Sequence, residues 1–210
     1  MMTQSIVVIG GSGFVGQGVC KEALRKNISV ISISKHGKPQ KEQPWMSHPL
    51  MIWVKADIFT DTSWKHYLAD CLGCINLIGI LFQNKHRGQT YHRMIFYTNH
   101  LISSVCEEFQ IPYLFLSAKA GPVGYLKAKK LAEQDLLDKT NSVIIIRSGL
   151  VTTKRRPLTI FKGTAIQLAA HIPIVHHLAE RAYPVSRKKL SEEIIKRLLE
   201  KRSVIVNDVR

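Results

Sequence analysis

Short β-branched runs alternate with segments of helical hydrophobic spacing along the first part of the chain. Residues 5–9, SIVVI, lead into the glycine-rich residues 10–13, and apolar positions then recur at helical spacing as far as Lys26. Residues 28–33, ISVISI, form the next apolar run. This order predicts a strand, a glycine turn, a helix and a second parallel strand.

The same alternation continues to about residue 150. The pattern predicts strands near 51–55, 74–78, 113–116 and 143–146, with helices over 62–71, 91–109 and 125–137. Asp61 or Thr62 is the expected cap of the helix over 62–71. Strands that alternate with helices indicate an α/β fold, a Rossmann doubly wound parallel sheet of order 3-2-1-4-5-6, because right-handed crossovers permit little else.

The alternation loosens beyond Arg147. The pattern then gives a basic stretch at 152–157, an apolar segment at 158–178, a helix near 190–201 and a short last strand at 203–206, which would be a seventh strand. We expect residues 1–150 to form a dinucleotide-binding core. Residues 151–210 are too few for an independent domain, so we expect a small helical cap of the same domain, beside the ligand edge of the sheet.

Composition narrows the class of protein. Hydrophobic residues make up 45% of the 210 residues and charged residues 21%, which excludes a disordered or low-complexity chain. The formal net charge of +15 favours phosphates, anionic lipid or an acidic protein partner. No helix-turn-helix, zinc-finger or aromatic-basic stacking pattern accompanies the charge, so we do not expect nucleic acid as a partner.

The cysteines, the histidines and the apolar segments indicate the redox state of the thiols, the absence of a metal site and the cellular location that we expect. Cys20, Cys71, Cys74 and Cys106 are too few for a disulfide scaffold and indicate reduced thiols. His171, His176 and His177 have no acid or cysteine beside them, so we expect no metal site. No leader pattern precedes residues 5–9, and the apolar runs are too short to span a membrane. We expect a cytoplasmic protein, and peripheral attachment to the inner membrane stays open.

A glycine-rich motif stands between the first predicted strand and helix. Its residues are Gly10, Gly11, Ser12, Gly13, Phe14, Val15 and Gly16. Glycines permit the tight turn and the close approach of a pyrophosphate, whose charge the free N–H groups of the helix N-terminus stabilise. The context therefore predicts a dinucleotide site.

The second strand ends in a hydroxyl and a base where a site for NAD would carry an acid. Ser34 and Lys35 lie about 20 positions beyond the glycines, where the adenosine ribose is bound in such folds. A lysine there pairs with a 2′-phosphate, so we expect NADP(H), with NAD the less favoured cofactor. Asp57, with Ile58 beside it, follows the third strand, and it is either a contact of the adenine edge or an ordinary strand-end acid.

A second set of polar residues follows the fifth strand. Ser117 ends that strand, and Tyr125 and Lys129 are spaced i, i+4 on the next helix. This spacing allows the ammonium to lower the phenol pKa from near 10, so that Tyr125 serves as an acid or base while Ser117 holds a substrate oxygen. Asn99 is a candidate to complete the proton path. The alternative is that Tyr125 is a packed aromatic residue.

These motifs together resemble the short-chain dehydrogenase/reductase superfamily, in its extended and atypical, epimerase/dehydratase-like branch. The matching stretches are VVIGGSGFVG (7–16), SISKHGKP (32–39), WVKADIF (53–59), NLIGIL (76–81), FLSAKAG (115–121), YLKAKKLAE (125–133), IIIRSGL (144–150) and RAYPVSRKKLSEE (181–193). The resemblance implies that Gly79 and Gly149 also line the cofactor. It also implies a catalytic triad of Ser117, Tyr125 and Lys129.

Two functions stay open from the sequence. One is an NADP(H)-dependent oxidoreductase, or an epimerase or dehydratase, acting on a small apolar or quinone-pathway substrate. The other is a redox-silent NADP-binding accessory protein of ubiquinone biosynthesis or of a respiratory complex, because the resemblance implies such roles for this branch. Only seven residues separate Ser117 from Tyr125, fewer than in the classical enzymes of the superfamily, which leaves turnover open. The basic C-terminal region is expected to meet an anionic membrane surface or a membrane-associated protein complex.

Overall fold

The computed structural model describes residues 5–149, 151–152, 185–207 and 209. Several features of the sequence lie outside these residues, namely Lys154, Arg155, Arg156, the apolar segment at 158–178, and the histidines at 171, 176 and 177. The helices within the described residues are too short or too polar to cross a membrane.

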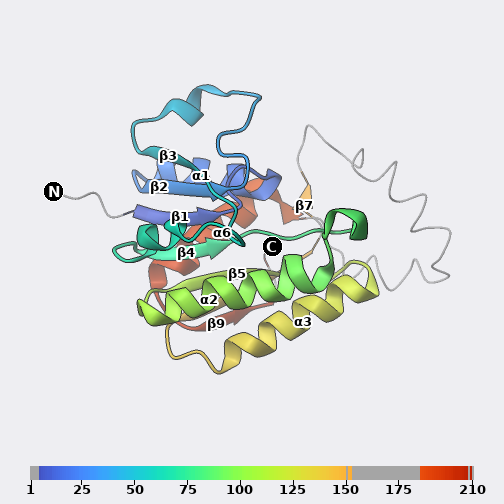
Figure 1. Ribbon diagram of the computed structural model, residues 1–210. Helices are drawn as coiled ribbons and strands as arrows, with labels where there is room; N and C mark the ends of the chain where they lie inside the picture. The colour runs from blue at the N-terminus through green and yellow to red at the C-terminus, as the bar shows by residue number, and fades with distance from the viewer. Residues whose placement is uncertain (1–4, 150, 153–184, 208, 210) are drawn as a thin grey trace.

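A parallel sheet forms the centre of the molecule (Figure 1). Its strands are β1 (Ser5–Ile9), β2 (Ser29–Ser34), β3 (Met51–Lys55), β4 (Gly73–Asn76), β5 (Tyr113–Ala118), β6 (Val143–Ser148) and β9 (Val204–Val206). They are hydrogen-bonded in the order β3-β2-β1-β4-β5-β6-β9, and every pair is parallel. This confirms the predicted doubly wound sheet, and β9 adds the seventh strand at the β6 edge.

Helices cover both faces of the sheet (Figure 1). They are α1 (Phe14–Arg25), α2 (Thr98–Glu108), α3 (Val123–Leu137) and α6 (Arg187–Glu200). Alternate residues of each buried strand point to opposite faces. Side chains such as Ile6 and Val8 therefore join the core under α1 and α6, and Val7 and Ile9 join the core under α2 and α3.

The C-terminal helix differs from the expected cap in its position. Helix α6 packs along α1 on the face of the sheet, where a Cβ on Gly18 would lie 2.7 Å from the Ser191 Oγ. A two-stranded parallel sheet of β7 (Val151–Thr152) and β8 (Val185–Ser186) precedes α6, and the sequence pattern did not predict it. The pattern missed it because two-residue strands carry no periodicity.

Two predicted helices are of another type. The segment predicted as a helix over 62–71 is a short 3-10 helix, η2 (Ser63–Leu68), in which the Asp61 carboxylate accepts a hydrogen bond from the Ser63 N–H at 2.7 Å. The long helix over 91–109 begins as a π-helical turn, η4 (His92–Tyr97), before α2. Within the part of the chain that the structure describes, the remaining short helices are the 3-10 helices η1 (Pro44–Ser47) and η3 (Lys85–Arg87).

The four cysteines are buried free thiols. Burial raises the pKa values of Cys20 and Cys71 to about 12, and it also raises the pKa of Cys74. The thiolates of these three residues are therefore scarce near neutral pH. All four side chains serve as small hydrophobic residues of the two cores.

Candidate functional site

The glycine turn brings the backbone of β1 directly to the start of α1. Gly10 has a φ of +89°, which favours glycine, and its N–H donates to the Ile33 carbonyl at 2.8 Å. A Cβ on Gly16 would collide with the Gly10 carbonyl oxygen and lie 2.6 Å from the Gly11 Cα. These contacts leave no room for a side chain between the turn and the first turn of α1.

The N-terminus of α1 is open to an anion. Its N-cap is Gly13, which provides no side-chain cap, and the first turn carries no acidic residue. The Gln17 amide reaches back to donate to the Ser12 carbonyl at 2.8 Å, which holds the turn in place. Uncapped N–H groups and the helix dipole favour a pyrophosphate at this position, so the residues present fit a dinucleotide.

A cavity of about 150 Å³ lies beyond the ends of β2 and β3. It brings together Ser34, Lys35, Asp57 and Ile58, which the sequence analysis assigned to the adenosine end of the site. The Ser34 hydroxyl donates to the Gly37 carbonyl at 3.0 Å, so its proton closes the turn after β2. Ser34 therefore fixes the loop that borders this cavity, and its hydroxyl oxygen can still accept a hydrogen bond.

Lys35 and Asp57 form an ion pair across this cavity. The Lys35 Nζ lies 2.8 Å from the Asp57 Oδ2, and the Phe59 N–H donates to the Asp57 Oδ1 at 3.2 Å. The hydrogen bond from Lys35 holds the pKa of the Asp57 carboxyl below its ordinary value. The two residues were predicted as separate contacts, and the structure places them together because parallel strands end at the same edge of the sheet.

Two further basic residues of this cavity were not among the predicted site residues. Arg87 and Arg93 line it from η3 and η4. The Arg93 guanidinium lies 4.6 Å from the centre of the Phe59 ring, and the π-helical turn positions it there. The available signal was the concentration of basic residues between 85 and 93, which did not reveal that this segment folds back over the ends of β2 and β3.

A second cavity of about 230 Å³ lies at the ends of β4, β5 and β6. It brings together six residues of the predicted site, Val15, Gly79, Ser117, Tyr125, Lys129 and Gly149. Ile78 lines both cavities, so the two adjoin at the end of β4. Together with the glycine turn, the residues of these two cavities are the ones that would hold a dinucleotide.

Ser117 presents a buried hydroxyl at this second cavity. It is 2% exposed at the end of β5, and among the described residues its Oγ has no hydrogen-bond partner. A buried hydroxyl that stays unpaired costs free energy, about 1–3 kcal/mol, which a hydrogen bond to a bound ligand would recover. Ser117 is thus suited to hold a substrate oxygen.

The prediction that Lys129 lowers the pKa of the Tyr125 phenol is wrong. The Lys129 Nζ donates to the Leu116 carbonyl at 2.6 Å and lies 5.8 Å from the centre of the Tyr125 ring. Burial lowers the pKa of Lys129 to about 7 and raises the pKa of Tyr125 to about 12. Desolvation therefore outweighs the attraction that the i, i+4 spacing predicted.

A second tyrosine packs beside Tyr125, and the sequence analysis missed it. The Tyr91 ring meets the Tyr125 ring edge-on with centres 6.2 Å apart, and the Tyr91 hydroxyl donates to the Leu81 carbonyl at 2.9 Å. A Cβ on Gly124 would lie 3.0 Å from the Tyr91 ring. Tyr91 thus connects the segment after β4 to the helix that carries Tyr125. No sequence motif indicated this contact.

Asn99 lies outside the catalytic group, contrary to the prediction. It is fully buried on α2, where its Oδ1 accepts from the Tyr113 hydroxyl at 2.8 Å and its Nδ2 donates to the Ala132 carbonyl at 3.2 Å. The Tyr113 hydroxyl in turn accepts from the Asn76 Nδ2 at 2.9 Å. Asn99 therefore belongs to a chain of buried hydrogen bonds within the core rather than to the cavity of Tyr125 and Lys129.

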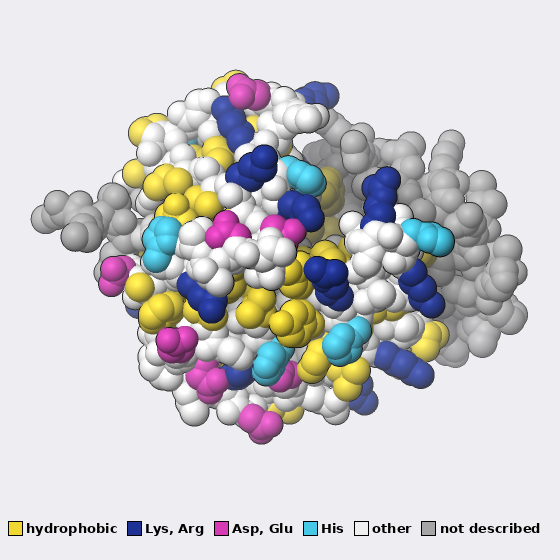
Figure 2. All heavy atoms as spheres, in the orientation of Figure 1, with side chains coloured by type: hydrophobic (Ala, Val, Ile, Leu, Met, Phe, Trp, Pro, Cys, Tyr) yellow, Lys and Arg dark blue, Asp and Glu magenta, His cyan; other side chains and the backbone are white. Residues whose placement is uncertain are grey.

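Charge is unevenly distributed over the molecule (Figure 2). On the viewed face, Lys and Arg side chains gather toward the side where the strands end, and Asp and Glu side chains gather toward the opposite side (Figures 1 and 2). A positive field at the carboxyl edge favours anionic ligands such as a dinucleotide.

A parallel sheet with a glycine turn and adjoining cavities at its carboxyl edge defines a protein of the dinucleotide-binding Rossmann class. Residues 6–141 match the NAD dependent epimerase/dehydratase family, and the chain belongs to that family. This family membership confirms the expected resemblance to epimerase/dehydratase-like short-chain dehydrogenases, and it supports dinucleotide binding.

Two curated proteins are similar to the chain over most of its length. One is the uncharacterized protein At1g32220, chloroplastic, of Arabidopsis thaliana, 29% identical over 73% of this chain and 53% of that protein. The other is MIOREX complex component 2 of Saccharomyces cerevisiae, 26% identical over 69% of this chain and 49% of that protein. The chain thus spans about half the length of the curated relatives it matches.

A solved structure has the same fold. The Bordetella bronchiseptica enzyme WbmH, crystallised in complex with NAD⁺, superimposes with a TM-score of 0.68 at 13% sequence identity, covering 97% of this chain and 74% of that enzyme. The similarity supports the fold.

Proposed function

We propose that the chain is an NADP(H)-dependent oxidoreductase acting on a small apolar or quinone-pathway substrate. The observation that carries this proposal is the meeting of Ser117, Tyr125 and Lys129 in a cavity that adjoins the glycine turn. Family membership supports the dinucleotide. Leu77, Ile80 and Leu81 line the same cavity and favour an apolar substrate.

The chain's own residues fit a reduction. NADPH, when bound, supplies the hydride. The Ser117 hydroxyl donates a hydrogen bond to the substrate oxygen, and the Tyr125 phenol, whose raised pKa of about 12 keeps it protonated, gives that oxygen its proton. The Lys129 amine holds the end of β5 through the Leu116 carbonyl, 5.8 Å from the centre of the Tyr125 ring.

A substrate screen tests this activity. Purified chain with NADPH and isoprenoid quinone precursors should show oxidation of NADPH, and Tyr125→Phe should lower turnover by about two orders of magnitude or more while NADPH binding is retained. Tyr97→Phe is a matched control, because Tyr97 is an exposed tyrosine that does not line the cavity. Turnover that is equal in Tyr125→Phe and in the control would remove Tyr125 from the mechanism.

The preference for NADP(H) over NAD(H) rests on the adenosine-side cavity. Lys35, Arg87 and Arg93 line it against a single carboxylate, Asp57, which favours a 2′-phosphate. NADPH should therefore bind at least about tenfold more tightly than NADH. Lys35→Glu should reverse this order, whereas Lys41→Glu, an exposed charge reversal in the following loop, should preserve it. Equal affinities for the two cofactors in the unmodified chain would refute the preference.

A redox-silent accessory role is the second candidate. The observation that favours it is the Lys129 amine, which donates to the Leu116 carbonyl and leaves the Tyr125 pKa high. The similar yeast protein is by name a component of a complex. In this role the chain would bind NADP(H) in a ubiquinone-biosynthesis or respiratory assembly at the membrane. Cells that lack the gene and make less quinone would then be rescued equally by the unmodified chain and by Tyr125→Phe.

A further inference from the structure

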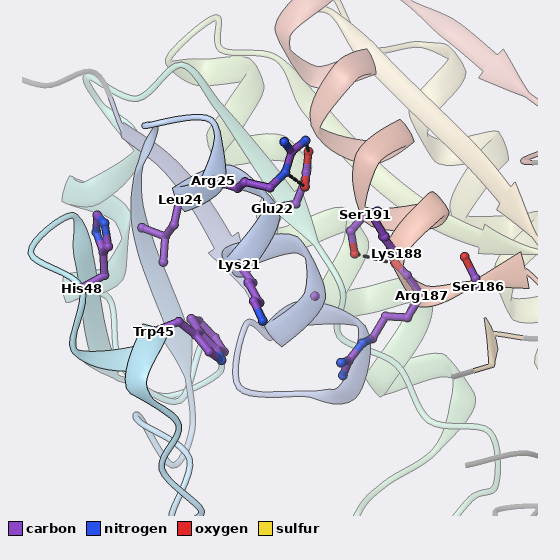
Figure 3. A pocket seen from close by; sticks show the side chains of 11 residues that line it. Lys21, Glu22, Leu24, Arg25, Trp45, His48, Ser186, Arg187, Lys188 and Ser191 are labelled. Atoms are coloured by element: carbon purple, nitrogen blue, oxygen red, sulfur yellow. Dashed lines mark hydrogen bonds and ion pairs between the residues drawn. The ribbon is translucent and has the colours of Figure 1, made fainter. Parts of the chain in front are cut away.

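A further cavity lies away from the dinucleotide site. It has a volume of about 700 Å³ and opens between α1, the start of α6 and the 3-10 helix η1 (Figure 3). It shares no lining residue with the two cavities at the strand ends. The proposed function therefore leaves this space unused.

One part of the cavity is apolar. Trp45 from η1 and Leu24 from α1 line it, and Gly18 contributes only backbone (Figure 3). The Trp45 ring packs on Trp53 with centres 6.0 Å apart, which fixes one wall. A flat aromatic wall beside an aliphatic side chain suits the apolar body of a small ligand.

Another part carries positive charge that no described acid neutralises. Lys21 extends toward Trp45, and Arg187 extends from the start of α6 (Figure 3). Within the described ranges neither forms an ion pair; the Arg187 guanidinium donates to the Phe14 carbonyl at 3.3 Å and lies 4.9 Å from the centre of the Phe14 ring. Arg25, by contrast, is paired with Glu22 at 2.8 Å.

The first turn of α6 increases this positive charge. Ser186 caps the helix by accepting a hydrogen bond from the Lys189 N–H at 3.1 Å, and the turn that follows holds basic residues and no acidic one. Basic side chains at a helix N-terminus repel the positive end of the helix dipole. A bound anion would relieve this repulsion.

We propose that this cavity binds a small amphipathic anion, an aromatic or aliphatic body that carries one carboxylate, sulfonate or phosphate. The anionic group lies between Lys21 and Arg187, and the apolar body lies against Trp45 and Leu24. The cavity volume falls within the range of about 300–1,000 Å³ typical of small-molecule sites. The site is independent of the proposed oxidoreductase activity, because it shares no residue with it.

The dye 8-anilinonaphthalene-1-sulfonate, an aromatic body with one sulfonate, tests the proposal on the full chain. Titration in the presence of saturating NADPH should show one site by dye fluorescence. Lys21→Glu and Trp45→Ala should each weaken binding by at least about tenfold. Lys130→Glu is the matched control, since it reverses an exposed lysine on α3, and it should leave dye binding unchanged.

Competition experiments distinguish a site for an amphipathic anion from a site that binds any small anion. Decanoate should displace the dye, and inorganic phosphate at the same concentration should not. The proposal fails if NADPH displaces the dye, if phosphate alone displaces it, or if Lys21→Glu binds as the control does. Lys21→Gln repeats the measurement without charge reversal should Lys21→Glu not fold, and near-ultraviolet circular dichroism verifies folding of each variant.

Discussion

Lys129 couples the stability of the protein to pH. Burial lowers its pKa from the ordinary 10.5 to about 7, so between these values the unfolded chain binds a proton that the folded chain does not. Stability therefore rises with pH across this window, and it is independent of this group below about 7. Chemical denaturation at pH 7, 8 and 9 should show the free energy of unfolding rising, apart from the effects of other groups.

The variant Lys129→Met isolates this contribution. It retains an unbranched side chain without the amine, so the rise between pH 7 and 9 should be smaller than in the unmodified chain. Lys130→Met, at the exposed neighbouring position, should keep the full rise. Equal slopes for Lys129→Met and the unmodified chain would mean that Lys129 is protonated in the folded protein at neutral pH.

Gly16 is expected to tolerate no side chain. A Cβ there would enter the space of the Gly10 carbonyl and the Gly11 backbone, which cannot move without opening the glycine turn. Gly16→Ala should lose dinucleotide binding and destabilise the chain by about 1–3 kcal/mol. Gly79→Ala is the control for stability, because the nearest atom to its Cβ, the Lys129 Nζ, lies 3.8 Å away. Isothermal titration with NADPH and urea denaturation measure the two effects.

The packing of α1 on α6 depends on a small residue. A Cβ on Gly18 would lie 2.7 Å from the Ser191 Oγ and 2.9 Å from the Arg187 Cγ. Gly18→Val should therefore separate the two helices and lower the free energy of unfolding by about 1–3 kcal/mol. Ser191→Ala should recover part of that loss in the double variant, which a double-mutant cycle by urea denaturation measures. Strict additivity of the two changes would show that α1 and α6 do not pack through this contact.

At the scale of elements, the sequence predicts what is periodic. The β-branched runs and helical spacings identify the strands of the large sheet and their order, because burial on both faces requires apolar residues there. The π-helical turn η4, the 3-10 helix η2 and the pair of β7 and β8 are too short or too irregular to leave such a pattern. Their positions depend on tertiary packing.

The candidate site likewise has residues that the sequence pattern predicts and residues that it does not. The glycine turn and the residues at strand ends were predictable, since parallel strands deliver Lys35, Asp57 and Ser117 to one edge. Arg93 and Tyr91 were not, because their positions depend on how the irregular segment after β4 folds back. The raised pKa of Tyr125 was not predictable either, because burial controls it and residue spacing in the sequence gives no information on burial.

At the scale of the whole molecule, charge is the property that the fold leaves unexplained. The formal net charge is +15, and residues 151–210 hold 13 basic residues against 5 acidic ones. Such an excess costs self-repulsion in the folded state and favours an anionic surface. An anionic membrane is the partner that we predict, with Lys154, Arg155 and Arg156 among the residues that approach it.

Vesicle co-sedimentation tests the prediction. Each basic residue near an anionic surface contributes about 1 kcal/mol, and the attraction fades within a Debye length of about 8–10 Å at physiological ionic strength. Binding to phosphatidylserine vesicles should therefore weaken as salt rises from about 0.05 M to about 0.5 M. Reversing the charges of Lys154, Arg155 and Arg156 should weaken it further and leave NADPH affinity unchanged, because the glycine turn lies elsewhere in the chain.

The outcome at the two salt extremes identifies the force involved. Absence of binding at low salt would exclude a direct lipid contact and leave an acidic protein as the partner. Binding that persists at high salt would assign the attachment to the apolar segment at 158–178 rather than to charge, since screening does not weaken apolar burial. Polar substitutions in that segment should then release the chain from the vesicles, whereas charge reversal at the three basic residues should not.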